Sequence, residues 1–320
     1  MGKRHIFILN PAAGQGKAFS LEGDIIKTGY RLGMDVEIYK TKEVLDAQVE
    51  AVRFAQSATP KSPVRLYACG GDGTVNEVLN GIVGYDNVEL AIIPTGTGND
   101  FIRNYGKSED FLDIERQMLG QARKTDVIGY KSSTDSYSSI RYCINMFNIG
   151  FDCDVVRECA RLKTKPLISG SMAYLLGVAQ KLIQMKGTDL KIIFENGKSI
   201  SGKLLLLAVG NGCYCGGGVK GIPYAKTDDG LMDVSIIKRC KRNQFIRLFP
   251  KYVKGEHLET KLGQEYIKYL QVKKLSIVAN NDSMYFSTDG EITHTKRLDL
   301  EIVPNAINFS VPLMSEYSII

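Results

Sequence analysis

Three glycines surround one aspartate in the run Gly70-Gly71-Asp72-Gly73-Thr74. The strand-like residues 65–69 lead into this run, and the helix-compatible residues 75–82 follow it. Glycine lets backbone N–H groups approach a phosphate closely, and the N-terminus of the following helix adds positive potential. The carboxylate of Asp72 brings negative charge into the same turn, which suits a Mg²⁺ ion held between protein and phosphates. The pattern predicts a nucleotide-phosphate site.

A second loop of small residues lies near the start of the chain. It is the run Asn10-Pro11-Ala12-Ala13-Gly14-Gln15-Gly16-Lys17, between a predicted strand at 6–9 and a predicted helix at 17–30. Its small residues leave N–H groups able to face an anion, and Lys17 offers a positive charge. The spacing of a Walker A loop is missing, so a purely structural turn is the alternative.

A third loop of this kind is Pro94-Thr95-Gly96-Thr97-Gly98-Asn99-Asp100-Phe101. Its threonines, Thr97 among them, suit phosphate or ribose contacts, and Asp100 is a second candidate for organising a metal ion. The alternative is a helix start that Asn99 or Asp100 caps. Three such loops in succession favour one phosphate site over three unrelated structural turns.

The elements that must position these loops alternate along residues 1–127. Strands are predicted at 6–9, 36–39, 64–69 and 89–93, and helices at 17–30, 44–56 and 75–82. This alternation predicts a doubly wound α/β domain, in which helices cover both faces of a parallel sheet. Ligands of such sheets bind beyond the carboxyl ends of the strands, where all three loops lie.

The pattern changes in residues 128–320. Strands are predicted at 141–149, 190–195, 203–209, 231–237, 275–279, 284–287 and 298–302, most of them joined by turns. This order predicts a C-terminal antiparallel β-rich, sandwich-like domain, whose last segment could return to the first domain. Two helical insertions are predicted, at 171–185 and 241–254.

Composition narrows the class of protein. The chain has 320 residues, and its formal charge of +6 favours anionic partners without separating nucleic acid, anionic lipid and nucleotide. Seven cysteines without regular spacing argue against a disulfide framework, and Cys213-x-Cys215 lacks the second ligand pair of a zinc site. We find no pattern of a secretory signal and no apolar run of membrane-spanning length. We therefore expect a cytoplasmic protein whose membrane contact is peripheral.

Further motifs extend the three loops into a family pattern. They are Asn145-Met146-Phe147-Asn148-Ile149-Gly150-Phe151-Asp152, Asp228-Asp229-Gly230-Leu231-Met232-Asp233, Gly255-Glu256-His257 and Asp289-Gly290-Glu291. In this order, over nearly the whole chain, the sequence resembles the diacylglycerol kinase catalytic domain family, in its soluble bacterial lipid kinase branch. The Gly-Gly-Asp-Gly motif alone is shared with NAD kinases and sphingoid-base kinases, and the later motifs favour the lipid kinases.

The resemblance implies ATP as the phosphoryl donor, with its phosphates on the loops of the first domain. The residues that match the family's nucleotide contacts are Asn10, Pro11, Ala12, Ala13, Gly14, Lys17, Thr41, Gly71, Asp72, Gly73, Thr74, Val75, Asn76, Glu77 and Thr97. Thr41 follows the second predicted strand, and without the resemblance it is only a threonine at a strand end.

Four carboxylates match the catalytic residues of the family. The resemblance implies that Asp72, Asp100 and Asp126 order catalytic Mg²⁺, partly through water, and that Glu291 is the catalytic base. Without the resemblance, a surface position at the start of a strand explains Asp126 equally well. The corresponding alternative for Glu291 is an exposed glutamate beside an Asp-Gly hairpin turn.

The run Lys226-Thr227-Asp228-Asp229-Gly230-Leu231 resembles a second, structural Mg²⁺ site of the same family. The resemblance implies a carboxylate ligand from Asp229 and backbone carbonyl ligands from Lys226 and Leu231. Hard cations prefer such oxygen ligands. An acidic surface turn is the alternative.

Two segments bear on a lipid substrate. Residues 238–254 hold seven Lys or Arg and no acidic residue, with apolar residues among them, so they could bind an anionic membrane surface or form a solvated face. Residues 171–185 are rich in apolar side chains, which could line a groove for acyl chains or pack in the core.

The sequence thus predicts an ATP- and Mg²⁺-dependent lipid kinase that phosphorylates diacylglycerol at the inner face of the membrane. The alternatives are a kinase of the same fold acting on phosphatidylglycerol, a sphingoid base or NAD, and a non-catalytic regulator that binds nucleotide or lipid. We expect no nucleic-acid partner. A homodimer formed by strand pairing between the β-rich domains stays open.

Overall fold

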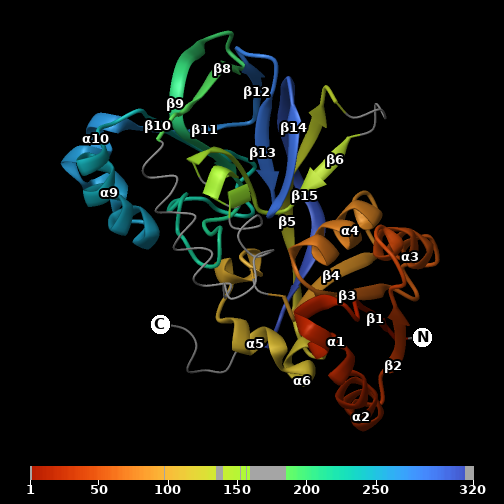
Figure 1. Cartoon of the computed structure of the whole chain (residues 1–320). Coiled ribbons are helices and arrows are strands. Elements are labelled where there is room, and N and C mark those ends of the chain that lie inside the picture. Colours follow the sequence, from red (N-terminus) through yellow and green to blue (C-terminus); the bar gives the residue numbers. More distant parts are fainter. Residues whose placement is uncertain are drawn as a thin grey trace. The chain divides into compact units, whose positions relative to one another are not determined.

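A computed structural model describes residues 2–96, 98–134, 140–151, 153–155, 157–158 and 185–313. The chain divides into two units. The first comprises Met1–Val127, Thr227–Asp229 and Val303–Ile320, and the second comprises Ile128–Lys226 and Gly230–Ile302. Each unit is described on its own below, with the element labels of Figure 1.

The first unit contains a parallel sheet in the order β15-β4-β3-β1-β2. Its strands are β1 (Arg4–Leu9), β2 (Asp35–Lys40), β3 (Val64–Gly70), β4 (Val88–Pro94) and the last part of β15 (Arg297–Val311). Every residue of β3 is buried, as expected for a strand at the centre of a parallel sheet. The predicted doubly wound α/β architecture is confirmed.

Helices cover both faces of this sheet (Figure 1). They are α1 (Lys17–Ser20), α2 (Glu22–Leu32), α3 (Asp46–Gln56), α4 (Asp72–Ile82), α5 (Ser108–Leu112) and α6 (Ile114–Met118), with 3₁₀ turns η1 (Ala13–Gly16) and η2 (Phe101–Asn104). The single helix predicted at 17–30 is wrong in detail, because the chain forms two helices that are separated at Leu21. A Cβ atom at Gly81 of α4 would lie 2.8 Å from the Cβ of Ala51, so this glycine lets α3 and α4 pack closely.

The last part of β15 completes the first unit. Asn308 and Phe309 pair in parallel with Glu89 and Leu90 of β4, and the Asn308 amide donates to the carbonyls of neighbouring residues. The Phe309 ring lies against the rings of Phe101, Tyr105 and Phe111. A segment from the C-terminal end of the chain therefore forms one strand of the N-terminal sheet and part of its core.

A buried arginine holds the centre of the first unit together. Arg65 of β3 is 2% exposed, and its Nε donates to the Glu89 carboxylate on β4 at 2.6 Å. Its remaining guanidinium N–H groups donate to the carbonyls of Gln117 and Met118, at the end of α6, and of Gly120, just beyond it. One side chain thereby neutralises a carboxylate and satisfies carbonyl groups that the helix leaves without partners.

The second unit is antiparallel. Its strands are the last part of β5 (Gln121–Ser132), β6 (Arg141–Cys143), β7 (Met146–Gly150), β8 (Thr188–Phe194), β9 (Ser199–Gly210), β10 (Met232–Lys238), β11 (Ile267–Val272), β12 (Lys274–Ala279), β13 (Met284–Thr288), β14 (Glu291–Thr295) and the first part of β15. Strand β9 changes neighbours along its length, because it pairs with β8 up to Leu204 and then with β7 and β10. This change of partners lets the strands enclose an apolar core, as the sandwich-like prediction requires.

Three of these strands were not predicted from the sequence. Strand β14 has the sequence Glu-Ile-Thr-His-Thr, and most of its side chains are exposed or half-buried, so it lacks an apolar face that would reveal it. Strand β11 is half-exposed for the same reason, and β5 carries four exposed residues before it enters the core. The predicted strand at 141–149 is interrupted between β6 and β7.

The amphipathic helix predicted at 241–254 is present as α9 (Arg242–Lys254), followed by η3 (His257–Glu259) and α10 (Lys261–Tyr266). Its apolar residues Phe245 and Tyr252 pack with side chains of β7, β9 and β10. Gly255 ends the helix in the left-handed conformation, with φ of 79°. Apart from Met185, the helix predicted at 171–185 lies outside the described residues. Among the described residues, no helix is long and apolar enough to cross a membrane.

The histidine of the Gly255-Glu256-His257 motif is a buried packing residue. Its side chain is fully buried, its ring lies 4.8 Å from that of Tyr252, and neither ring nitrogen finds a hydrogen-bond partner among the described residues. Burial lowers the pKa of His257 to about 4. In this motif, Gly255 ends α9 and His257 packs behind that end.

This burial predicts a pH dependence of stability. The folded-state pKa of His257 lies below the usual histidine pKa of 6.5, so between pH 6.5 and pH 4 the unfolded chain binds the proton more tightly. The free energy of unfolding should therefore fall as the pH falls through this window. Burial also lowers the pKa of His5 to about 4, which adds a second contribution of the same sign.

Urea denaturation at both ends of this window tests the contribution of His257. A His257→Phe variant should lose less stability on acidification than the wild type, since phenylalanine cannot bind a proton. The exposed His294 gives the matched control, His294→Phe. An unchanged pH dependence in His257→Phe would contradict the assignment.

Candidate active site

Asn10 connects the first two predicted phosphate loops. It follows β1, its N–H donates to the Cys69 carbonyl, and its amide nitrogen donates to the Thr74 hydroxyl at 3.0 Å. Its amide oxygen accepts from the Ala12 N–H at 3.0 Å, which fixes the turn after β1. Thr41 follows β2, and its N–H donates to the Leu9 carbonyl at 2.9 Å. The loops after β1, β2 and β3 thus meet at one edge of the sheet.

The second and third loops are in direct backbone contact. The N–H groups of Thr95 and Gly96 both donate to the Gly70 carbonyl, at 3.0 and 3.2 Å. A Cβ atom at Gly96 would lie 2.5 Å from the Cα of Gly71, so no other residue fits without moving the backbone. A Cβ atom at Gly98 would collide with the Asp72 carboxylate. These glycines are needed for the contact between loops, which the sequence analysis did not foresee.

Asp72 begins α4, directly after Gly71, and its carboxylate oxygen accepts from the Asn99 N–H at 3.1 Å. Asn99 adopts a left-handed backbone with φ of 51°, and its amide donates to the Gly96 carbonyl at 2.7 Å. The third loop therefore folds around the Asp72 carboxylate. Thr97, which is in this loop, lies outside the described residues.

Asp100 and Asp126 are both buried within the first unit. Asp100 is 7% exposed, the Arg103 Nε lies 3.4 Å from its carboxylate, and its side chain does not cap η2. Asp126 is 1% exposed, and its carboxylate accepts from the Asn305 N–H at 2.7 Å. The surface alternative for Asp126 is therefore wrong. Burying a carboxylate costs free energy unless it is paired. A role in keeping the protein soluble therefore does not explain an aspartate at either position.

Two of the predicted nucleotide contacts have structural partners. The Glu77 carboxylate accepts from the Ala47 N–H at 3.2 Å, which ties α4 to the start of α3. Val75 is buried in α4. The Lys17 backbone begins α1, and Pro11 to Gly14 form the turn between β1 and that helix.

The predicted second metal loop divides between the units. Thr227 belongs to the first unit, where its carbonyl accepts from the Asp126 N–H at 2.8 Å and its hydroxyl lies 2.8 Å from that of Tyr105. Asp229 and Lys226 are exposed, and Leu231 is half-buried. Among the described residues, no three His, Cys, Asp or Glu side chains lie close enough together to hold a metal ion on their own.

Glu291 lies in the second unit, exposed, at the start of β14. It pairs with Thr288 across a two-residue turn formed by Asp289 and Gly290, whose φ angles are 47° and 92°. Positive φ at both positions defines a type I′ turn, the tight hairpin that Asp-Gly favours. The hairpin turn is confirmed. Glu291 is exposed, and its backbone is held by the pairing of β14 with β13.

Asp289 anchors this turn, and the sequence analysis gave it no role. One carboxylate oxygen accepts from the N–H groups of Asn145 and Met146 and from the Cys143 thiol, at 3.1, 3.0 and 3.1 Å. The other accepts from the Ile144 N–H at 3.0 Å. Burial raises the pKa of the Asp289 carboxyl, and these hydrogen bonds act in the opposite direction. The only sequence signal for this contact is the Asp-Gly pair itself.

Two family models match the chain. The diacylglycerol kinase catalytic domain matches residues 4–130, and the YegS C-terminal NAD kinase beta sandwich-like domain matches residues 145–311. A protein named diacylglycerol kinase from Staphylococcus saprophyticus is 31% identical over 91% of this chain and 90% of its own length. The chain belongs to the diacylglycerol kinase family. It is a kinase, and the predicted family is confirmed.

Other relatives agree with this assignment. A protein named diacylglycerol kinase from Bacillus subtilis is 29% identical over 90% of both chains. The crystal structure of a putative diacylglycerol kinase from Bacillus anthracis covers 99% of this chain and 98% of its own, with 24% identity and a TM-score of 0.73. This likeness shows that the kinase shares the fold of that structure.

Substitution of Gly98 should impair catalysis by displacing Asp72. In Gly98→Ala the new methyl group collides with the carboxylate, so either Asp72 or the third loop must move. Displacement of a positioned group by about 1 Å can cost roughly 10²-fold in rate, which sets the expected loss of kcat. Gly23→Ala in α2 meets no atom within 4 Å and should leave the rate unchanged. Steady-state assays compare the kcat of the two variants. Equal kcat values would contradict the prediction.

Substitution of Asp289 should loosen the hairpin that carries Glu291. In Asp289→Asn an NH₂ group must face one of the four donors, which costs about 1–3 kcal/mol of folding stability. We expect a lower kcat with little change in the KM for ATP, because the loops that are predicted to contact the nucleotide belong to the other unit. The exposed Asp282, in the connection between β12 and β13, provides the control Asp282→Asn. Lost stability with a wild-type kcat would show that the anchor does not position Glu291.

Proposed function

We propose that this kinase transfers the γ-phosphoryl group of ATP to the free hydroxyl of diacylglycerol and requires Mg²⁺. The observation that carries the proposal is the arrangement around Asp72, whose carboxylate lies at the N-terminus of α4 between two interlocked glycine loops. A cationic group is needed beside such a carboxylate if phosphates are to bind there, and Mg²⁺ supplies that charge in phosphoryl transfer.

The donor set suits Mg²⁺. Asp72, Asp100 and Asp126 offer hard oxygen ligands within one unit, and Mg²⁺ in kinases keeps several waters beside one or two carboxylates and phosphate oxygens. A cluster of three carboxylates is therefore not required, in agreement with its absence among the described residues. When bound, Mg²⁺ would neutralise charge on the phosphates. For the second ion, we propose the Asp229 carboxylate and the carbonyls of Lys226 and Leu231 as ligands.

The phosphates of ATP would lie against the loops after β1, β3 and β4. The first turn of α4 directs N–H groups toward this edge of the sheet, and Asn10 holds Thr74 in place. We assign the nucleotide contacts to the residues of Asn10–Gly14, Lys17, Thr41, Gly71–Glu77 and Thr97. The Glu77 carboxylate also fixes α4 against α3.

The acceptor hydroxyl must lose a proton as it attacks, and Glu291 is the proposed base. Its carboxylate is exposed, so it can meet a hydroxyl from a substrate, and the anchored type I′ turn restricts its position. A positioned general base contributes roughly 10²–10⁴-fold to the rate.

A lipid acceptor fits the second unit better than a soluble one. The solvent face of α9 carries Arg242, Arg247, Lys251 and Lys254, and Ile246 on the same helix is 58% exposed. Each basic side chain near an anionic membrane surface contributes about 1 kcal/mol to binding. We propose that the kinase acts at the cytoplasmic membrane surface through this helix.

Transfer of labelled γ-phosphate tests the reaction. The acceptors are diacylglycerol, phosphatidylglycerol, sphingosine, ceramide and NAD, in mixed micelles with Mg²⁺ or with a chelator. We expect labelling of diacylglycerol that the chelator abolishes and that Asp72→Asn and Glu291→Gln reduce at least roughly 10²-fold.

Glu195→Gln is the matched control for the base, because Glu195 is an exposed glutamate at another hairpin turn of the same unit. It should retain wild-type activity. Labelling of a different acceptor would show that diacylglycerol is not the substrate. The proposed mechanism of phosphoryl transfer would still stand. Binding of ATP without labelling of any acceptor would show that the protein does not phosphorylate these compounds.

A further inference from the structure

One face of the antiparallel sheet in the second unit carries a row of polar side chains. Residues that lie directly opposite each other on paired strands point to the same side of a sheet. The register therefore places one residue each from β13, β7, β9, β10 and β11 in a single row, namely Ser287, Asn148, Ala208, Ser235 and Tyr269. Four of the five have a hydroxyl or an amide group, and only Ala208, in the middle of the row, has neither.

The surroundings of this row are apolar. Leu206 and Ile237 lie two residues from the row on β9 and β10, and they share one buried apolar cluster with Phe245 of α9. On the other side of the row, Ile222 covers the sheet at Gly210, where an added Cβ would lie 2.9 Å from the Ile222 Cδ1. The row is thus a polar strip between apolar groups.

Two members of the row lack the hydrogen bonds that buried polar groups normally make. Asn148 is 8% exposed, and Ser235 is fully buried. Neither the Asn148 amide oxygen nor the Ser235 hydroxyl has a hydrogen-bond partner among the residues that the structure describes. An unsatisfied buried polar group lowers the stability of the fold. A sequence that keeps two of them at facing positions of one sheet favours a role in binding.

The spacing of these two side chains suits a glycerol diester. Asn148 and Ser235 both pair with Ala208, from opposite sides, so roughly 10 Å separates their backbones and only a methyl group of the sheet lies between them. The Ser235 hydroxyl can donate one hydrogen bond, and a half-turn of the Asn148 amide presents its NH₂ group as a second donor. A glycerol diester offers two carbonyl acceptors joined by a short chain.

We infer that the Asn148 amide and the Ser235 hydroxyl donate to the two ester carbonyls of diacylglycerol, so that the kinase selects a diester as its acceptor. This inference rests on the proposed function, because it names groups that would bind the acceptor of that reaction. The row ends at the hairpin of the proposed base, since Ser287 pairs with Ile292, the residue after Glu291. The acyl chains would lie against the apolar cluster beside the row.

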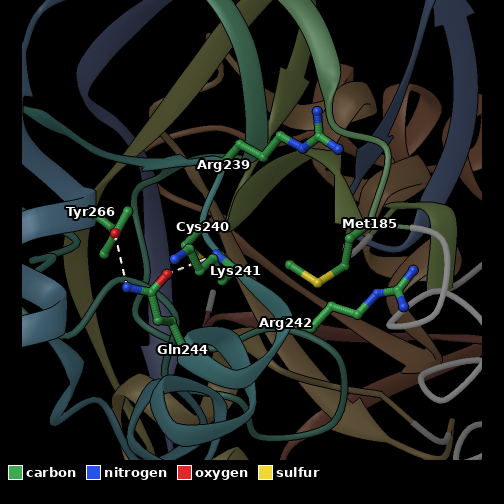
Figure 2. A pocket seen from close by; sticks show the side chains of 7 residues that line it. All are labelled: Met185, Arg239, Cys240, Lys241, Arg242, Gln244 and Tyr266. Atoms are coloured by element: carbon green, nitrogen blue, oxygen red, sulfur yellow. Dashed lines mark hydrogen bonds between the residues drawn. The ribbon is translucent and has the colours of Figure 1, made fainter.

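The pocket of about 560 Å³ at the start of α9 is less suited to this acceptor (Figure 2). It adjoins the same apolar cluster through Met185, but Arg239 and Lys241 also line it. The Gln244 side chain in its wall accepts from the Lys241 N–H at 2.8 Å and donates to the Tyr266 hydroxyl at 2.9 Å. An uncharged diester would bring cationic side chains no compensating charge, whereas the polar row offers it neutral donors.

Binding of a diester and of the matching diether tests the inference. The probes are dioctanoylglycerol and its dioctyl ether analogue, which lacks both carbonyls. Each is titrated calorimetrically into the full chain in neutral detergent micelles without ATP. We expect the wild type to bind the diester roughly tenfold more tightly than the diether, and Asn148→Leu and Ser235→Ala each to lower this ratio roughly threefold. Affinity for the diether should change little, because it has no carbonyl group to lose.

Ser310→Ala is the matched control. Ser310 is also fully buried, and its hydroxyl also lacks a partner within the described part of the chain, but it belongs to the first unit. This variant should keep the ester preference of the wild type. Thermal unfolding of all variants separates a binding role from a structural one. Because replacing an unsatisfied hydroxyl by hydrogen removes no hydrogen bond, Ser235→Ala should be at least as stable as the wild type.

Two results would overturn the inference. Equal affinity of the wild type for the diester and the diether, or binding of neither, would show that the ester carbonyls are not recognised. Lower melting temperatures of Asn148→Leu and Ser235→Ala with an unchanged ester preference would assign the row to structural hydrogen bonds. Glu291→Gln should keep the ester preference and lose phosphoryl transfer, so failure of the proposed reaction is distinguishable from failure of this inference.

Discussion

The contact between the backbones of Gly71 and Gly96 is the constraint on which the rest of the candidate site depends. Because a Cβ at Gly96 would lie 2.5 Å from the Gly71 Cα, the loops after β3 and β4 can approach this closely only with glycine at position 96. That approach brings Asn99 to Asp72, and it leaves no room for a side chain at Gly98. The carboxylate is therefore fixed by steric exclusion on one side and a hydrogen bond on the other.

The same principle recurs in the second unit with different groups. There a buried carboxylate, Asp289, accepts three consecutive backbone N–H groups and a thiol, and it thereby fixes the turn before Glu291. In both units an aspartate bound to loop N–H groups determines the geometry of a neighbouring loop. The kinase thus has hydrogen-bonded turns at the positions where its proposed chemistry occurs.

The helices, strands and loops could be predicted from the sequence where the hydrophobic periodicity and the spacing of glycines are clear. The alternating strands and helices of the first unit, the apolar strands of the second and the helix at α9 were all predicted from local patterns. Contacts between distant residues were not, because Asp126 meets Asn305 and Asp289 meets Ile144 only after folding. Strand β14 was not predicted, because it is an edge strand and its sequence has no apolar face. The glycines were predicted to approach phosphates, yet Gly96 and Gly98 are also required by neighbouring protein atoms.

The return of β15 to the first sheet has a consequence for how the protein is made. Strand β4 finishes early in translation, but its neighbour in the sheet, at Asn308 and Phe309, is synthesised roughly 200 residues later. At typical elongation rates the edge of β4 stays unpaired for on the order of ten to forty seconds on the ribosome. Throughout that interval the growing chain exposes an apolar parallel strand, a known template for aggregation. Nascent chains of this kinase therefore carry an unpaired sheet edge at β4 until residues 308 and 309 have been synthesised.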